Sequence, residues 1–440
     1  MARTKNSGVI LEKKRGVFEV QVSLGVDPET GKYSRISRTV HGRKADAQKV
    51  LRALIKQKED GINLRKSSMT FKEFSEQWHE SRVTAATLAP STLKGEEPIL
   101  AALNEHIGNI KLEALTPARI DGLYNQLRKE GSRSTPGKPL SETTMVKYHE
   151  VLSKVLKKAV HYDLILRNPC DRVTRPKVAQ VERKSLTKEN GAKLLKCVLE
   201  SETLYSERLQ EQLNKASSST SKNMAAFCTF NEGISALGNA VAVHVGLATG
   251  ARRGEVFGLS WRDIEMVQTK QGLFCTLKIR QTLDTLGNIK EPKTKTSKRD
   301  IAIDETTANS LSLLRKMQAS YLKCIGMKQT AQTPVFCSNV GGNIDLHNFE
   351  RWWRTWRTEN GFPTLKFHEL RHTQATQLLA NGVDVKTVQN RLGHANAAIT
   401  LNWYAHALPE NDKKAAALIG SLFAESEEEK TNVIQFQNAL

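Results

Sequence analysis

The stretch HELRH at residues 368–372 carries side chains that suit two different kinds of chemistry. His368 and His372 are four residues apart and would share one helical face, and the carboxylate of Glu369 completes the H-E-x-x-H pattern of zinc proteases. The same stretch places His368 three residues before Arg371, which pairs a titratable imidazole with a permanent cation and suits a phosphate group. The remainder of the sequence must decide between a metal site and an anion site.

The second half of the chain contains, in this order, the segments ATGARRGEVFGLSWRDI, EPKTKTSKRDIAI, HELRH and RLGHANAAITLNWYAH. The first matches an arginine box, roughly T-G-x-R-x-x-E followed by L-x-W-x-D, at residues 249–263. The last two match an H-x-L-R-H-T box at residues 368–373, then L-G-H at 392–394 and a tyrosine ten residues later, Tyr404. With these boxes the chain resembles the tyrosine recombinases of the phage integrase family. Four boxes in one order are far more specific than any single box, and the resemblance covers nearly the whole chain.

The resemblance implies chemistry on a DNA phosphodiester, and the residue types fit that chemistry. Attack on phosphorus adds negative charge to the nonbridging oxygens, which the guanidiniums of Arg252 and Arg371 can hold at any working pH. His368 and His394 can donate hydrogen bonds or exchange protons near neutrality. Tyr404 is the implied nucleophile, which would form a 3′-phosphotyrosyl bond and free a 5′-hydroxyl without ATP, metal or any other cofactor.

The leaving 5′-oxygen needs a proton, and the family takes it from a lysine in a β-hairpin. The segment EPKTKTSKRDIAI occupies that place, and both Lys293 and Lys295 fit a local K-T pattern. We prefer Lys293, because the family's lysine usually lies five or six residues before the hairpin arginine, here Arg299. The spacing alone leaves Lys295 as the alternative. An ammonium group is a competent general acid when neighbouring cations lower its pKa.

Other residues near these motifs are expected to have structural roles. Glu255 would orient a neighbouring basic group, and His372 would be a buried histidine that supports the adjacent arginine. The segment FERWWRTWRT has tryptophans at helical spacing, which predicts core positions with arginines at the rim: Trp352, Trp353 and Trp356.

The zinc interpretation of HELRH lacks a third ligand. In the extended zinc-protease motif a glycine and a histidine follow, but Ala375 and Leu378 occupy those places, and no glutamate lies between Glu369 and Glu410. A zinc site would also place Arg371, a cation, within one turn of the metal. We therefore expect an anion site, with Glu369 as an exposed or structural residue.

The composition favours a nucleic-acid partner. The chain has 66 Lys and Arg against 46 Asp and Glu, a net charge of +20, which suits a polyanion and gives a peptidase no obvious advantage. Its six cysteines are scattered without a C-x-x-C pair, which indicates reduced thiols. No apolar run has the length of a signal peptide or a membrane-spanning helix, so the expected location is the cytoplasm, at the nucleoid.

The length of 440 residues predicts two to three domains, and the patterns indicate an α+β multidomain protein. Residues 1–66 combine alternating segments around the turn DPETGK with a helical segment, which predicts a small three-stranded sheet plus a helix. A basic sheet braced by a helix could enter a DNA groove. By resemblance this part is the arm-site DNA-binding domain.

Residues 69–175 show apolar positions at three-to-four spacing, which predicts an all-α domain, by resemblance the core-site DNA-binding domain. Ser91, Thr116 and Ser141 are predicted N-caps, with a proline following Thr116 at the first helical position. The segment NPCDRVTRPKVAQ at residues 168–180 is predicted to be a linker.

Residues 183–425 are expected to form the catalytic domain, mainly helical with a small β-sheet made by FCTLKIRQTL and KRDIAIDE. The polar stretch from about Glu200 to Gly238 is predicted to be a surface insertion. Residues 426–440 form a tail that is acidic and then apolar, and our hypothesis is that Val433–Leu440 docks onto a neighbouring subunit.

The resulting expectation is a site-specific recombinase that integrates and excises a mobile element through a Holliday junction. The resemblance implies a homotetramer on core and arm sites of double-stranded DNA, with an excisionase and a host DNA-bending protein as further partners. Two alternatives remain open. A type IB topoisomerase-like strand transferase would share the tyrosine chemistry but needs no arm module. A non-catalytic DNA-binding protein would explain the charge but not the set Arg252, His368, Arg371, His394 and Tyr404.

Overall fold

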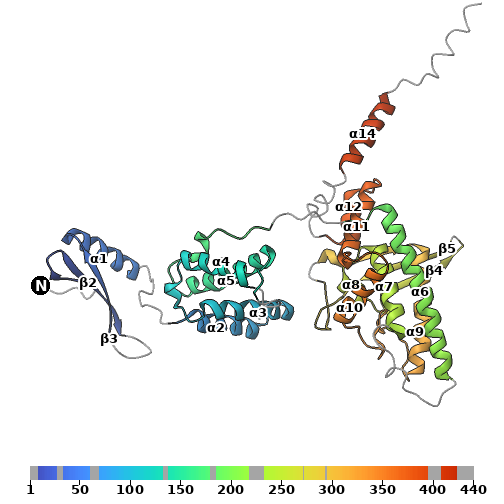
Figure 1. Ribbon diagram of the computed structural model, residues 1–440, viewed down its shortest axis with the longest axis horizontal. Helices are drawn as coiled ribbons and strands as arrows, with labels where there is room; N and C mark the ends of the chain where they lie inside the picture. Colours follow the sequence, from blue (N-terminus) through green and yellow to red (C-terminus); the bar gives the residue numbers. More distant parts are fainter. Residues whose placement is uncertain are drawn as a thin grey trace, which may run out of the picture. The chain divides into compact units, whose positions relative to one another are not determined.

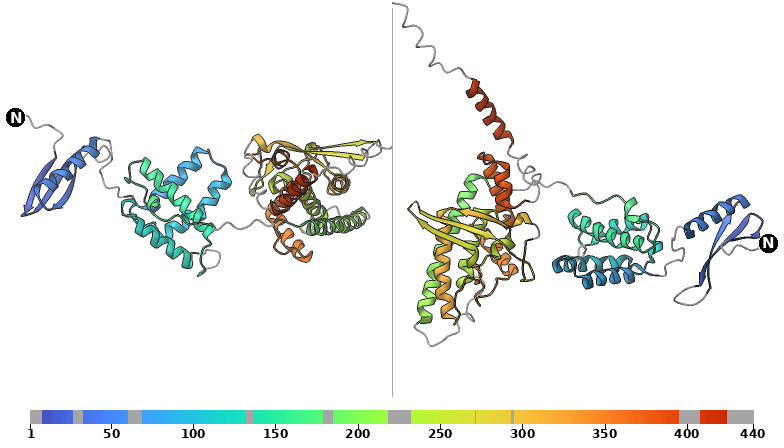
Figure 2. Two further views of the ribbon diagram at one scale, coloured as in Figure 1. Left: turned by 90° about the horizontal axis from the view of Figure 1, so that it is seen from above. Right: turned by 180° about the vertical axis from the view of Figure 1, so that it is seen from behind.

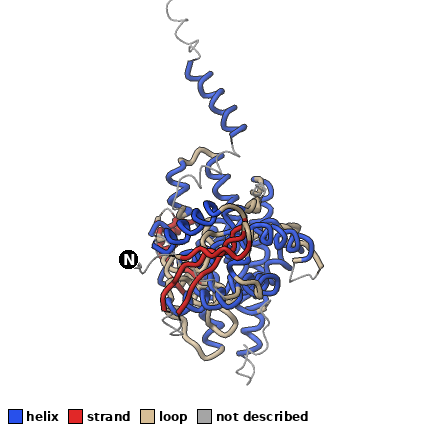
Figure 3. The backbone as a smooth tube through the Cα atoms, turned by 90° about the vertical axis from the view of Figure 1, so that its left-hand side faces the viewer, coloured by secondary structure: helices blue, strands red, loops and turns tan. Residues whose placement is uncertain are grey.

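A computed structural model describes residues 8–26, 33–59, 69–131, 137–178, 185–217, 232–270, 272–292, 295–394 and 408–423 of the chain. The contacts between residues divide the chain into two compact units, Met1–Gln180 and Val181–Leu440. Most of the described secondary structure is helical, and the strands form small antiparallel sheets (Figure 1, Figure 3). Within these ranges, no helix is long and apolar enough to cross a membrane.

The N-terminal part of the first unit is a three-stranded sheet with one helix. The strands pair in the order β1 (Val9–Lys14), β2 (Val17–Val26) and β3 (Tyr33–His41), and helix α1 (Lys44–Glu59) packs on β2. Alternate residues of β2 are buried with residues of α1 in a small core: Phe18, Val20, Val22, Ala47 and Leu54. The predicted sheet with one helix is confirmed, while residues 27–32 of the predicted turn lie outside the described residues.

The rest of the first unit is a bundle of four helices: α2 (Phe71–Ala85), α3 (Pro90–Ile107), α4 (Pro117–Glu130) and α5 (Glu142–His161). The predicted caps at Thr116 and Ser141 are confirmed, since both side chains accept hydrogen bonds from the first helical turn. The predicted cap at Ser91 is wrong, because α3 already begins at Pro90 with Ala89 as its N-cap. Proline is favoured at the first helical position, where its missing N–H costs nothing, so the helix starts ahead of the serine.

The predicted linker is also partly wrong. Its first residues form a short 3₁₀ helix, η2 (Pro169–Arg172), which packs against α4 and α5. Cys170 and Val173 are buried in the core of the bundle, and the side chain of Asn168 accepts a hydrogen bond from the backbone of Cys170 at 3.0 Å. Prolines indicated irregular backbone correctly, but they do not tell whether that backbone is exposed.

The second unit is built around α7 (Gly233–Thr249), which is buried along nearly its whole length. It packs against α6 (Lys188–Ser217) and α9 (Glu305–Cys324). Residues 201–217, predicted as part of a surface insertion, are instead the second half of α6, and they contribute Leu209 and Leu213 to the core. The prediction was wrong because these apolar residues are sparse, yet they share one helical face that α7 and α9 cover.

The predicted strands of the second unit are confirmed. They form the sheet β4 (Ile264–Thr269), β5 (Gly272–Ile279) and β8 (Arg299–Ile303), which lies against one side of the helices (Figure 2). A short hairpin of β6 (Thr282–Leu283) and β7 (Ile289–Lys290) follows β5. The remaining elements are α8 (Arg253–Phe257), η4 (Trp261–Asp263), η5 (Lys295–Ser297), α10 (Leu346–Glu359), α11 (Phe367–Ala380), α12 (Val385–Leu392) and α14 (Leu408–Phe423).

Candidate active site

The turn after α7 begins the site. Gly250 ends the helix in the left-handed conformation, with φ of 62°. A side chain at this position would meet the amide of Gln374 at 2.5 Å and Leu392 at 2.6 Å, so only glycine lets the turn approach α11 and α12 this closely. The T-G pair of the arginine box is therefore a helix stop that brings the next residues to these two helices.

Arg252 is the N-cap residue of α8, and Glu255 is the third residue of that helix. One carboxylate oxygen of Glu255 accepts a hydrogen bond from the backbone nitrogen of Arg252 at 2.9 Å, and the other accepts one from Arg252 Nη1 at 2.8 Å. The R-x-x-E spacing thus places the carboxylate where it caps the helix and orients the guanidinium at once. The Arg252 side chain remains 42% exposed, so it is available to an incoming anion.

Arg371 lies on the first turns of α11 and is only 3% exposed. Its Nη1 donates to the carbonyl oxygen of Gly250 at 2.9 Å and its Nη2 to that of Leu392 at 2.6 Å. Burial and then the neighbouring Arg252 guanidinium lower the pKa of Arg371 to about 9, so the side chain is still a cation at neutral pH. Two glycine-terminated helix ends, those of α7 and α12, hold this guanidinium in place.

The L-G-H segment ends α12. Leu392 is fully buried, and Gly393 ends the helix in the left-handed conformation with φ of 67°. The carbonyl oxygen of Gly393 accepts a hydrogen bond from Arg252 Nη2 at 3.5 Å, next to the Leu392 carbonyl that Arg371 uses. The turn presents His394, which is 6% exposed and accepts a bond from Gln389 at its carbonyl oxygen at 3.0 Å.

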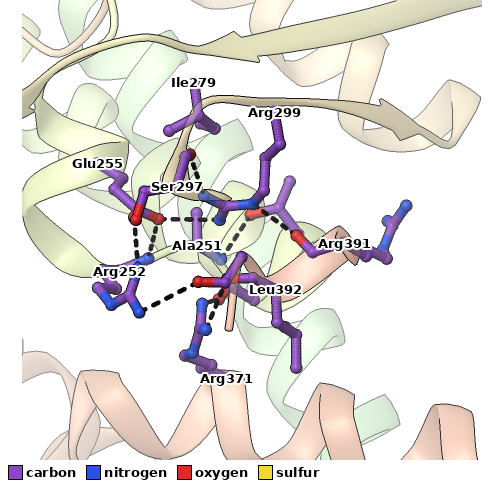
Figure 4. A network of polar contacts seen from close by, with 12 residues as sticks. Ala251, Arg252, Glu255, Ile279, Ser297, Arg299, Arg371, Arg391 and Leu392 are labelled. Carbon is purple, nitrogen blue, oxygen red and sulfur yellow. Dashed lines mark hydrogen bonds and ion pairs between the residues drawn. The ribbon is translucent and has the colours of Figure 1, made fainter. Parts of the chain in front are cut away.

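A second buried arginine completes the cluster. Arg299, at the start of β8, donates to Glu255 at 2.9 Å, to the carbonyl oxygen of Arg391 at 2.7 Å and to that of Ser297 at 3.0 Å (Figure 4). Burial alone would raise the pKa of Glu255, but the charge and hydrogen bonds of Arg299 and Arg252 outweigh it and hold that pKa below its ordinary value. Glu255 is thus an ionised carboxylate shared by two arginines, as the sequence predicted for its orienting role.

The cluster carries more positive than negative charge. In the part shown in Figure 4, Arg252 and Arg299 both donate to the carboxylate of Glu255, and Arg371 donates to main-chain carbonyl oxygens beside them. Burial and then these guanidiniums lower the pKa of His394 from 6.5 to about 4, so its imidazole is neutral at physiological pH. Such a field disfavours a further cation, including a divalent metal, and favours an anion of phosphate type.

The two histidines of HELRH have different environments. His368 is exposed at the start of α11, whereas His372 is 7% exposed, and their rings meet edge to face with centroids 4.7 Å apart. His368 is the last of the groups that lower the pKa of His394, so His368 lies within electrostatic reach of the cluster. Glu369 accepts a bond from the backbone of Lys366 at 2.9 Å and so caps the helix, a structural role as predicted.

The structure describes some of the predicted site residues and not others. It brings Arg252, Arg371 and His394 together. Lys293 and Tyr404 lie outside the described residues, and Lys295 is the first residue of η5. The three tryptophans of α10 are at most 3% exposed, so the expectation that they lie in the core is confirmed: Trp352, Trp353 and Trp356.

Sequence reasoning missed Arg299 as a member of the site, although a signal was present. Buried residues alternate along β8, where Arg299, Ile301 and Ile303 are covered and Asp300 and Ala302 are exposed. An arginine on the inward face of a strand requires a buried carboxylate or carbonyl partners. The alternation of R-D-I-A-I therefore indicated a buried cation, but only the fold shows that its carboxylate is Glu255.

The chain was compared with known families and proteins. Residues 210–411 match the model described as "Phage integrase family", and residues 70–174 match the "Phage integrase SAM-like domain". The ICEBs1 integrase of Bacillus subtilis (strain 168) is 24% identical over 93% of this chain and 98% of its own length. A "Tyrosine recombinase XerC-like" protein of Caldanaerobacter subterraneus subsp. tengcongensis is 33% identical over 40% of this chain and 47% of that protein.

The chain belongs to the phage integrase family of tyrosine recombinases. Among solved structures, the integrase of transposon Tn1549 in complex with a circular intermediate DNA has the same fold, with a TM-score of 0.57 and 19% identity over 80% of this chain and all of that chain. The predicted fold class and the enzyme class of a tyrosine site-specific recombinase of mobile elements are therefore confirmed.

Proposed function

We propose that this recombinase integrates and excises its element by cutting and rejoining DNA through a 3′-phosphotyrosyl intermediate. The observation that carries the proposal is the pair of guanidiniums, Arg252 and Arg371, fixed on consecutive carbonyls of one turn. They are pre-oriented hydrogen-bond donors within an excess of positive charge, which is what a phosphorane-like transition state needs.

In this proposal Tyr404 supplies the nucleophile. Its phenol oxygen bonds to phosphorus, the bond from phosphorus to the 5′-oxygen breaks, and Lys293, or alternatively Lys295, protonates the leaving oxygen. Arg252 and Arg371 hold the nonbridging oxygens, while His368 and His394 donate hydrogen bonds or carry the tyrosine's proton. Attack by a 5′-hydroxyl reverses every step, so the bond energy is conserved without ATP, and the proposal involves no metal or cofactor.

The same proposal divides the chain into residues 1–66 for arm sites, 69–175 for the core site, 183–425 for catalysis and 426–440 as a tail.

One surface of the helical bundle supports the core-site role. It is a hollow between α2 and α5 that we call the basic groove, lined by Trp78, Arg82, Lys154, Lys157, Lys158 and His161. Lysines and arginines that line one hollow suit the regularly spaced phosphates of a duplex.

The N-terminal sheet supports the arm-site role. Since Phe18, Val20 and Val22 face α1, the other face of β2 carries Gln21 and Ser23, and Arg35 pairs with Ser23 across the strands. Arg35 also donates to the side chain of Gln21 at 3.4 Å. A braced sheet with arginine and glutamine on its outer face fits the dimensions and donor pattern of a DNA major groove.

Assembly is the remaining part of the proposal. In this proposal the strands are exchanged in pairs through a Holliday junction, which requires a homotetramer. An excisionase and a host DNA-bending protein set the direction of the reaction. The reaction takes place in the cytoplasm, at the nucleoid. Helix α14 leaves four neighbouring apolar side chains at least 54% exposed, which would suit a contact with another subunit: Leu418, Ile419, Leu422 and Phe423. Residues 433–440 of the tail lie outside the described residues; if deletion of this tail left cooperativity unchanged, its proposed docking would be wrong.

A covalent-trapping assay tests the proposal. The purified protein is incubated in EDTA with nicked duplexes taken from the DNA flanking its own gene, beside Tyr404→Phe, and products are separated under denaturing conditions. The expected result is a protein–DNA adduct that survives EDTA and disappears with Tyr404→Phe. Tight binding without an adduct, on duplexes that include wider flanking DNA, would instead favour a non-catalytic DNA-binding protein.

A strand-transfer assay addresses the topoisomerase-like alternative. A recombinase joins strands between two duplexes and needs more than one subunit, whereas a topoisomerase-like enzyme only relaxes supercoiled DNA and works as a monomer. The arginine cluster serves both reactions equally, so the presence of a separate sheet module at residues 8–59 is the observation that favours recombination.

A further inference from the structure

Arg299 lies at the centre of the active-site cluster without being exposed to a substrate. Its side chain is 6% exposed, whereas that of Arg252 is 42% exposed. All three of its recorded acceptors belong to the protein: the carboxylate of Glu255 and the carbonyl oxygens of Arg391 and Ser297. Arg371 is buried as well, but its two bonds are to carbonyl oxygens, whereas Nε, Nη1 and Nη2 of Arg299 each donate to a protein acceptor and one of these is a carboxylate. Arg299 is therefore placed to act through its neighbours.

Two of those neighbours control the exposed guanidinium. The carboxylate of Glu255 accepts a hydrogen bond from Arg299 Nη2 at 2.9 Å and another from Arg252 Nη1 at 2.8 Å, so the two arginines share one carboxylate. The Arg391 carbonyl belongs to the same turn as the Leu392 and Gly393 carbonyls, which hold Arg371 and Arg252. Arg299 thus holds the carboxylate of Glu255, which orients Arg252, and it also holds the 391–393 turn, whose carbonyl oxygens accept hydrogen bonds from Arg252 and Arg371 (Figure 4).

The packing around Arg299 leaves little freedom. A Cβ atom at Gly393 would lie 3.0 Å from Arg299 Nη1 and 3.2 Å from its Cδ, so the glycine and the arginine are in close contact. Without Arg299, the buried Glu255 would have Arg252 as its only recorded cationic side-chain partner within the described residues. The full charge of the carboxylate would then draw Arg252 inward, away from an incoming phosphate.

We propose that Arg299 is a positioning residue for the two phosphate-binding arginines: by neutralising Glu255 and bracing the 391–393 turn, it keeps Arg252 and Arg371 directed at the scissile phosphate. This inference rests on the proposed function. Arg299 differs from Arg252, Arg371, the lysine, the histidines and Tyr404, because its guanidinium nitrogens already donate to protein acceptors.

The test compares two substrates that differ only in charge. One nicked duplex carries the ordinary scissile phosphate, and the other carries a methylphosphonate there, in which a methyl group replaces a nonbridging oxygen and removes the negative charge. Adduct formation is timed for the wild-type protein and for Arg299→Met, Arg299→Lys and Arg252→Ala. The matched control is Arg357→Met, since Arg357 on α10 is half-buried and also donates to a main-chain carbonyl oxygen, that of Leu365.

The expected result is that Arg299→Met slows adduct formation on the phosphate roughly 10²-fold, the effect of losing a pre-oriented electrostatic contact, and much less on the methylphosphonate. Arg252→Ala should show the same selectivity, Arg299→Lys should recover part of the rate, and Arg357→Met should behave as the wild type on both substrates. A purely structural role for Arg299 predicts equal losses on the two substrates, and that outcome, or no loss at all, would overturn the inference.

Two further outcomes are distinguishable. If Arg299→Met does not fold, the double variant Glu255→Gln/Arg299→Met removes the unpaired buried charge. In this double variant, adduct formation should still slow more on the phosphate duplex than on the methylphosphonate duplex. An equal slowing on both substrates would again overturn the inference. If the wild-type protein itself forms no adduct on either substrate, the proposed function fails, and the inference with it.

Discussion

Arg252 and Arg371 donate to consecutive carbonyl oxygens, those of Gly393 and Leu392, although the two arginines are more than a hundred residues apart in sequence. The turn between α12 and His394 therefore fixes the spacing of the two guanidiniums relative to each other and to that histidine. Like charges are brought together here at a cost in stability, which is offset by carbonyl dipoles and by Glu255. Sites that concentrate unfavourable charge in this way are typically functional.

The planar guanidinium of Arg371, with its two donating nitrogens, should matter more for cleavage than its positive charge alone. In Arg371→Lys a single ammonium group cannot donate hydrogen bonds to the Gly250 and Leu392 carbonyl oxygens and to a phosphate with the planar geometry of a guanidinium. We therefore expect covalent adduct formation to slow by roughly 10²-fold or more. The matched control is Arg253→Lys, next to the site in sequence but paired with Glu350 on α10. If both lysine variants keep the wild-type rate of adduct formation, the bidentate role of Arg371 is wrong.

Gly393 should be needed for its space as well as for its backbone conformation. Gly393→Ala should lose about 1 kcal/mol of stability for the left-handed φ, and adduct formation should also slow because its Cβ would push against Arg299. Gly382→Ala is the control, since Gly382 has φ of 83° but nothing within 4 Å of an added Cβ. Urea unfolding should report a loss of stability for both variants, the larger one for Gly393→Ala, and only Gly393→Ala should lose cleavage. Equal cleavage by the two would count against the close contact.

His394 should make the protein less stable in mild acid. Burial and then the guanidiniums of Arg371 and Arg252 lower its pKa in the folded state from 6.5 to about 4, so as pH falls through this window the unfolded chain binds a proton that the folded chain does not. Stability is therefore highest above the unfolded pKa. Between about pH 7.5 and about pH 5 this histidine alone should cost about 2 kcal/mol.

Urea unfolding at the two pH values checks this expectation. In His394→Gln the pH-dependent loss should shrink by about that amount, because glutamine does not titrate in this range. His347→Gln, at the start of α10, is the control for removing a histidine elsewhere in the same unit. An unchanged pH dependence in His394→Gln would show that the field of the arginines does not act on this ring.

The basic groove should bind DNA through charge. Lys157→Glu and Lys158→Glu should each weaken binding to core-site duplexes and reduce the slope of log affinity against log salt by about one per lost phosphate contact. Lys72→Glu, on α2 but outside the groove, is the matched control. Fluorescence anisotropy titrations over a range of salt give both quantities. Equal slopes for all three variants would place the DNA elsewhere on the bundle.

The second half of α6 should behave as core. Leu209 is 1% exposed and Leu204, on the same helix, is 43% exposed. Leu209→Ala should lower the free energy of unfolding by roughly 2–5 kcal/mol, whereas Leu204→Ala should change it by less than about 1 kcal/mol. Thermal or urea unfolding measures both. Comparable small losses would mean that residues 201–217 are a dispensable surface segment after all.

The sequence by itself predicted most of the local structure and several residues that the fold brings together in the site. Alternation predicted β2, β5 and β8, three-to-four spacing predicted the helical bundle, and the boxes identified Arg252, Arg371 and His394 as partners, since such patterns follow from backbone geometry and from what a phosphate requires. Local sequence was less reliable where burial depends on a distant element. Residues 201–217 and Pro169–Val173 look polar or irregular, yet α7, α9 and the bundle cover them.

Only the tertiary structure decided how the charges are held. The bonds from Arg371 to Gly250 and Leu392, and from Arg299 to Glu255 and the Arg391 carbonyl, join segments separated by 21 to 121 residues. No periodicity encodes such pairings, because an arginine can satisfy any carbonyl or carboxylate that the fold brings within reach. The residue types therefore indicate which reaction is feasible, and the packing of α7, α11, α12 and β8 decided that Arg252 stays exposed while Arg299 and Arg371 are buried.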